Sequence, residues 1–180
     1  MSVAYKNFWS LNTDEAVVCG ILRSETEKNI EVLMPMNAQM KGIDLVLMNV
    51  ETKKAVTIQV KGSRAYEPRK SEMYKYGHGN CGWYKLNAGT VHDATADYFI
   101  FLVYIIEEIE KIGRRTLSPH SIVIPTVKLQ ELTKKHKKGF DYLFWVNPKT
   151  KEAFDIRDEK FHVNEYLDGA GFKLLNNELK

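Results

Sequence analysis

The chain has 180 residues, of which 44% are hydrophobic, 11% aromatic and 27% charged. This composition is that of an ordinary globular protein, and it excludes a disordered tail, a collagen-like fibre and a small disulfide-stapled scaffold. The 26 Lys and Arg residues against 23 Asp and Glu residues give a net charge of +3. A charge this small does not by itself indicate a nucleic-acid-binding protein.

Cysteine usage and hydropathy predict a cytoplasmic protein. Cys19 and Cys81 lie far apart and form no Cys-x-x-Cys pair, so we expect a reduced chain without a disulfide framework. The N-terminus lacks the apolar core of a signal peptide, and polar residues interrupt every long apolar stretch. We therefore expect no membrane association. No repeat or linker divides the chain, so we expect a single domain over residues 1–180.

The first predicted element is a helix over residues 13–27. Asn12, Thr13 and Asp14 are residues that cap helix N-termini, and apolar residues recur after them at helical spacing. Apolar runs at 30–34, 43–50 and 55–61 then predict three strands. A short polar turn joins the last two runs, so we expect a hairpin that the first strand extends to a three-stranded meander.

Residues 62–82 break this periodicity with several glycines and one proline, and they predict a long loop. Further strands are expected at 83–86, 98–106 and 121–124, a helix at 127–136, and short strands with a final helix over the last forty residues. The predicted fold class is α/β, with one mixed central sheet flanked by helices. Its aromatic core is expected to include Trp83, Tyr98, Phe99, Phe101 and Trp145.

The strand at 55–61 carries the most informative polar residues. Alternation places its valines and isoleucine on one face, as expected for a core, and Gln59 and Lys61 on the other. Asp44 begins the neighbouring strand of the hairpin, so a carboxylate, an amide carbonyl and an ammonium group are expected to converge at one end of the sheet. Carboxylate and carbonyl oxygens suit Mg²⁺, and a lysine beside them can orient a water and stabilise charge on a phosphate.

In these residues the chain resembles the PD-(D/E)xK nuclease superfamily, which has the restriction-endonuclease-like fold. The family pattern is a helix bearing a Glu, a strand entered by an Asp, and a strand carrying (D/E)-x-K. Here Glu15, Asp44 and the pair Gln59-Val-Lys61 take these places, in the Q-x-K form that some members carry. Ile43 stands where the family name has its proline, and the resemblance covers about residues 10 to 105.

The resemblance implies a core that starts helix-strand-strand-strand and a Mg²⁺-dependent, or Mn²⁺-dependent, endonuclease acting on DNA in restriction, repair or mobile-element biology. It implies that Asp44 and Gln59 hold the metal and that Glu15 adds a ligand directly or through water. Lys61 would assist the attacking hydroxide.

The predicted loop after Lys61 is the candidate nucleic-acid-binding segment. It carries Arg64, Arg69, Lys70 and Lys75 among several tyrosines, a mixture that suits phosphates and bases. A solvated loop with ordinary charges is an equal alternative.

Alternatives also remain for the site as a whole. Asp44 could serve as a strand-entry residue that bonds turn amides, and Glu15 could simply complement the helix dipole. Gln59 in place of the family's acid keeps open a catalytically inactive nuclease-like domain that binds nucleic acid or a partner protein. The sequence leaves both a monomer and a homodimer open.

Overall fold

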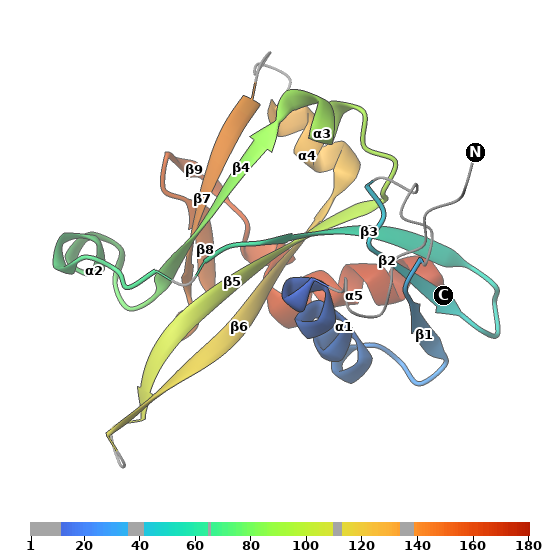
Figure 1. The fold of residues 1–180 in the computed structure, drawn as a ribbon, viewed down its shortest axis with the longest axis horizontal. Coiled ribbons are helices and arrows are strands. Elements are labelled where there is room, and N and C mark those ends of the chain that lie inside the picture. The colour runs from blue at the N-terminus through green and yellow to red at the C-terminus, as the bar shows by residue number, and fades with distance from the viewer. Residues whose placement is uncertain (1–11, 36–41, 65, 110–112, 134–138) are drawn as a thin grey trace.

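The structure is a computed structural model that describes residues 12–35, 42–64, 66–109, 113–133 and 139–180. Within these residues the chain forms a five-stranded sheet, with strand order β1-β2-β3-β5-β6, and a four-stranded sheet, with order β4-β7-β8-β9. The predicted α/β class is confirmed. The predicted mixed sheet is present, but a second, antiparallel sheet accompanies it, because β4, β7, β8 and β9 pair among themselves rather than extending the first sheet (Figure 1).

The five-stranded sheet is mixed. Its strands are β1 (Ile30–Leu33), β2 (Leu45–Asn49), β3 (Ala55–Gly62), β5 (Tyr98–Ile109) and β6 (Arg114–Pro125). The first three form the predicted antiparallel meander, and the elements of the described residues begin in the order helix-strand-strand-strand. The turn between β2 and β3 forms because the Asn49 side chain accepts hydrogen bonds from the backbone amides of Glu51 and Thr52. β5 then runs parallel to β3 and antiparallel to β6.

The four-stranded sheet is antiparallel and consists of β4 (Asn80–Asn87), β7 (Gly139–Asn147), β8 (Glu152–Asp155) and β9 (Asp158–His162). It packs on one face of β5 and β6 through an aromatic cluster in which Phe101 contacts Tyr84, Tyr142 and Phe144. Fully burying such a side chain stabilises the fold by about 1.5–3 kcal/mol. Trp83 points away from this cluster and is 46% exposed, so its prediction as a core residue is wrong.

Two helices cover the opposite face of the five-stranded sheet. Val18 and Leu22 of α1 (Thr13–Glu25) and Leu175 of α5 (Asp168–Leu179) pack against β2, β3 and β5. α1 ends two residues before the predicted boundary. The remaining helical segments are α3 (Ala88–His92), α4 (Thr126–Thr133) and the 3₁₀ turn η2 (Asn164–Tyr166). The predicted end of the helix at 127–136 lies outside the described residues.

The segment predicted as a loop contains a helix, α2 (Lys70–Tyr76). It begins where the Glu72 carboxylate accepts a hydrogen bond from the Arg69 amide at 2.7 Å, and it ends at Gly77, whose φ of +78° suits glycine. Tyr76 fixes it to the four-stranded sheet by ring contacts with Trp145 and Phe154. Among the described residues, 63–64 and 66–79 form an arm that projects from the sheets, with α2 at its end (Figure 1).

Candidate functional site at the fork of β2 and β3

Asp44 lies where β2 and β3 separate. The Asp44 amide donates a hydrogen bond to the carbonyl oxygen of Ile58 at 2.8 Å. Its carboxylate oxygen Oδ2 then accepts a hydrogen bond from the Val60 amide, also at 2.8 Å. The Asp44 side chain thereby adds one more hydrogen bond between the two strands, beyond the last one that their backbones form with each other. Extending the β2–β3 register by one step sets Asp44 opposite Gln59, on the same face of the sheet.

Lys61 follows on that face, two residues along β3, and it is partly buried. Burial lowers the pKa of its ammonium group below the ordinary value of 10.5, because desolvation disfavours the charged form. The carboxylates of Asp44 and Glu15 oppose this shift. Lys61 is thus within electrostatic reach of both acids.

Glu15 reaches the fork from α1. Asn12 caps this helix by accepting a hydrogen bond from the Asp14 amide at 3.2 Å. Glu15 then shares a helix face with Val18 and Leu22, which pack into the core, and it is only 8% exposed. A role limited to the helix dipole would leave this carboxylate at the surface, whereas here it is buried and acts electrostatically on Lys61.

Gln59 is also 8% exposed, and its carbonyl oxygen Oε1 is buried without a hydrogen-bond partner among the described residues. An unsatisfied buried acceptor costs about 1–3 kcal/mol. Gln59 lines a pocket of about 240 Å³ together with Gly42 and residues of α3 and the turn that follows it, among them Thr90, Asp93 and Thr95. Gln59 therefore borders a space that a ligand can enter, while its amide oxygen is itself buried.

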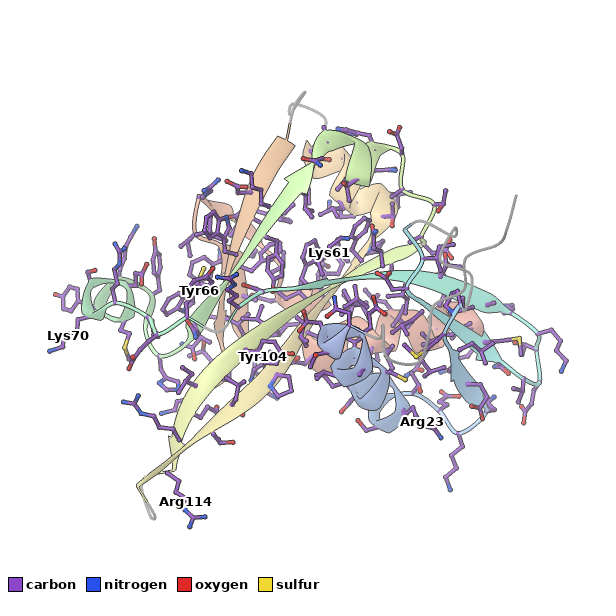
Figure 2. All side chains as sticks on the ribbon, viewed as in Figure 1. Arg23, Lys61, Tyr66, Lys70, Tyr104 and Arg114 are labelled. Atoms are coloured by element: carbon purple, nitrogen blue, oxygen red, sulfur yellow. The ribbon has the colours of Figure 1, made fainter. Side chains whose placement is uncertain are left out.

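Asp14 is part of the fork and was assigned only a capping role from the sequence. Its Oδ1 accepts a hydrogen bond from the Tyr104 hydroxyl at 2.9 Å, and with burial this bond raises the pKa of Tyr104 to about 12. The carboxylate also lies directly over Gly62, where a side chain would overlap it. Asp14 thus docks the start of α1 on the end of β3, next to Lys61. Figure 2 shows Tyr104 beside this end of α1.

The candidate nucleic-acid-binding residues lie apart from the fork. Arg64, Arg69 and Lys70 are exposed along the arm. Lys75 lies over the ring of Tyr76, with its Nζ 4.7 Å from the ring centroid and 3.0 Å from the hydroxyl oxygen. In Figure 2, Lys70 is at the far end of the arm while Lys61 is near the middle of the molecule. The structure thus sets Asp44, Gln59 and Lys61 on one face of the sheet, with Glu15 acting electrostatically on Lys61 from α1, and leaves the basic residues on the outside.

The fork offers oxygen ligands, but few of them are charged. Across the described part of the chain, no group of three or more His, Cys, Asp or Glu side chains is arranged to hold a metal ion. The available donors are the carboxylates of Asp44 and Glu15 and the amide oxygen of Gln59. Such a set fits Mg²⁺, which keeps several waters and binds proteins through one or two carboxylates.

Neither protein-family models, nor curated proteins, nor solved structures gave a match to this chain. Among the described residues, none of the helices has both the length and the apolar character needed to cross a bilayer. The family resemblance of the motif is therefore a prediction from the residues alone.

Proposed function

We propose that the chain is a Mg²⁺-dependent nuclease that hydrolyses phosphodiester bonds in DNA, with the restriction-endonuclease-like core that its motif resembles. One observation carries the proposal: the Asp44 carboxylate, held by the Val60 amide, lies opposite Gln59 and on the same face of the sheet as the partly buried Lys61.

Asp44 and Gln59 would hold the metal ion, with Glu15 as a further ligand directly or through a water. The amide oxygen of Gln59, which has no hydrogen-bond partner among the described residues, supports this role, because a cation would satisfy it. When bound, Mg²⁺ acidifies water and offsets the charge that develops on the phosphate. The hydrogen bond from the Val60 amide holds Asp44 in one orientation, so its carboxylate needs little reorganisation on binding.

Lys61 would orient the attacking water and donate a hydrogen bond to a phosphate oxygen. Its surroundings suit that role, because a donor in a partly desolvated site stabilises developing charge more strongly than it would in water. The carboxylates of Asp44 and Glu15 favour the charged ammonium and so oppose the desolvation that lowers its pKa.

Cleavage of supercoiled plasmid tests the proposal. With Mg²⁺ the wild-type protein should convert supercoiled DNA to nicked or linear forms, and EDTA should stop the conversion. Asp44→Asn should be inactive, while Glu51→Gln, which changes an exposed acid in the turn at the other end of the hairpin, should behave as wild type. Intact plasmid after incubation of the folded wild-type protein with Mg²⁺ or Mn²⁺ would contradict the proposal.

The second candidate is an inactive nuclease-like domain that binds nucleic acid or a partner protein. The small number of charged ligands within the described residues favours it. Such a domain would bind DNA equally well with Mg²⁺ and with EDTA and would leave the plasmid uncut.

A further inference from the structure

The arm presents a tyrosine that contributes nothing to packing. Tyr74 is 95% exposed, although it lies in a helix whose neighbouring aromatic residue is well packed. Tyr76 contacts Trp145 and Phe154, so it anchors α2 to the four-stranded sheet. Residues two positions apart in a helix point about 200° from each other, and Tyr74 therefore lies on the side of α2 that faces away from the sheet.

Lys70 shares this outward side. It lies one turn before Tyr74, at the i,i+4 spacing that makes two side chains neighbours on a helix surface. Both are exposed, and α2 buries none of its residues. The outer side of α2 thus consists of an aromatic ring with open faces and a cation next to it.

The charge around this side is positive. Residues 62–79 contain four Lys and Arg residues and two Glu residues. Glu67 forms an ion pair with Arg115 of β6 at 3.4 Å, and Glu72 accepts the Arg69 amide at the start of α2. Both acids are therefore engaged, while Arg64 and Lys70 are exposed. A polyanion is the partner whose charge complements this arm.

The path of the chain links the arm to the fork. The arm leaves β3 directly after Lys61, and the Ser63 hydroxyl accepts a hydrogen bond from the Trp83 amide at 2.8 Å, which ties its first residues to β4. Figure 2 shows Tyr66 between Lys61 and Lys70. Tyr66 and Trp83 are both part-exposed aromatic residues along this path. A strand that extends from the fork along the arm would pass exposed rings and cations.

From this placement we propose that Tyr74 stacks on an unpaired base and that the arm holds a single-stranded stretch of DNA beside the cleavage site. The identity of the ligand as DNA rests on the proposed nuclease function. In a duplex the faces of the bases are covered by their neighbours, so an exposed ring can stack only on an unpaired or terminal base. The substrate class is then DNA in which a duplex adjoins an unpaired strand.

Binding measurements on catalytically impaired protein test this inference. In a Lys61→Ala background with EDTA, fluorescence anisotropy would compare a duplex carrying a single-stranded overhang with a blunt duplex of the same length. Tyr74→Leu should weaken binding of the overhang substrate about tenfold, because stacking contributes about 1–3 kcal/mol per base. Tyr74→Phe keeps the ring and should bind the overhang as Tyr74 does. Binding of the blunt duplex should change little in either variant.

A base analogue gives an independent readout. The fluorescence of 2-aminopurine in the overhang should be quenched on binding by the Tyr74 and Tyr74→Phe proteins, and much less by Tyr74→Leu. Equal overhang affinity for Tyr74→Leu and Tyr74→Phe would overturn the inference. An equal loss for overhang and blunt duplex in Tyr74→Leu would also overturn it.

This outcome is separable from that of the proposed nuclease function. The titrations need no cleavage and no metal, so wild-type protein that leaves all DNA intact would contradict the nuclease while Tyr74-dependent overhang binding would still support the stacking. Conversely, plasmid cleavage together with Tyr74-independent overhang binding would support the nuclease and reject the stacking role.

Discussion

The fork of β2 and β3 and the arm that follows it carry similar residues in opposite environments. At the fork, Lys61 is partly desolvated and lies within electrostatic reach of two carboxylates. Gln59 there is almost completely buried. On the arm, Lys70 and Tyr74 are exposed to solvent. Burial holds a group in one geometry and strengthens its electrostatics, which suits chemistry. Exposure leaves a group free to meet a large partner, which suits association. The contrast predicts that changes at the fork alter rates and that changes on the arm alter affinity.

Replacing Lys61 should have the largest effect. Lys61→Ala should lower the rate of plasmid cleavage by about 10²–10³-fold, the loss that follows removal of one donor to a developing negative charge. Affinity for DNA should change little. Lys54→Ala removes an exposed lysine just before the same strand and should leave the rate unchanged. A comparable loss of rate in both variants would show that the loss is caused by the change in net charge rather than by the position of Lys61 at the fork.

The pH dependence of cleavage sharpens the assignment of Lys61. If the protonated ammonium is the active form, the rate should fall as pH rises through the lowered pKa of Lys61, so the alkaline limb should lie below pH 10.5. In Lys61→Arg the guanidinium stays charged, and any residual activity should lack that limb. An identical alkaline limb in both proteins would assign the titration to another group.

The next largest effect should follow from disturbing the contact between the start of α1 and the end of β3. Gly62→Ala places a methyl group into the Asp14 carboxylate, so the start of α1 must move and the hydrogen bond from Tyr104 must weaken or break. Overpacking of this kind costs roughly 1–3 kcal/mol, which thermal unfolding would register as a drop of a few degrees or more. The rate of cleavage by Gly62→Ala should fall further than its loss of stability explains, because the candidate metal ligand Glu15 moves together with α1.

Gly20→Ala is the matched control for that prediction. Gly20 lies in α1, and among the described residues no atom beyond its chain neighbours and the nearby helix backbone lies within 4 Å of an added Cβ. Alanine should stabilise α1 by up to about 1 kcal/mol, because glycine is the poorer helix former. A loss of stability in Gly20→Ala equal to that in Gly62→Ala would contradict the proposed contact between Asp14 and β3.

Gln59→Glu should tighten metal binding, whereas most substitutions of metal-binding residues weaken it. The added carboxylate supplies a negative charge and a second ligand oxygen, so calorimetric titration should show tighter Mn²⁺ binding, with Asp44→Asn as the weakened reference. Repulsion between the added carboxylate and Asp44 in the metal-free state limits the gain and should lower the stability of the apo protein. The absence of Mn²⁺ binding in both wild type and Gln59→Glu would favour the inactive domain.

Substitutions on the arm should have the smallest effect, and they should change only the affinity for DNA. Replacing Arg69 and Lys70 by Ala should flatten the slope of log K against log salt by about one to two units, because each neutralised phosphate releases counterions. The rate at saturating DNA should stay within a few-fold of wild type. An unchanged slope, measured by anisotropy between about 50 and about 200 mM salt, would remove these residues from the DNA interface.

Sequence reasoning succeeded where the determinants are local. The hairpin that sets Asp44 opposite Gln59 joins two adjacent apolar runs through a short turn, so alternation alone predicted the shared face. The contact of Asp14 with Gly62 and Tyr104 joins residues about 50 and 90 positions apart. Periodicity does not report such contacts. The one signal in the sequence for the close approach of α1 to β3 was Gly62, the glycine directly after Lys61.

The helix α2 and the second sheet were missed for different reasons. α2 buries no residue, so it lacks the apolar periodicity by which helices are predicted, and the glycines around it favour a loop. The strands of the second sheet were partly predicted, but β4 pairs with β7 across more than fifty residues of chain. Strand pairing at that separation depends on packing against the aromatic cluster rather than on local pattern.

The position of β5 has a consequence for how the molecule unfolds. Alternate residues of this strand enter different cores: Phe99, Phe101 and Val103 pack toward the four-stranded sheet, and Ile100 and Leu102 pack toward α1 and α5. Neither core can open without disturbing the strand that they share. Residues 98–102 of β5 also lie between β3 and β6, so this part of the strand is paired on both sides. In hydrogen exchange we expect the amides of residues 98–102 to exchange only by global opening, which couples the fork to the distant sheet in one cooperative unit.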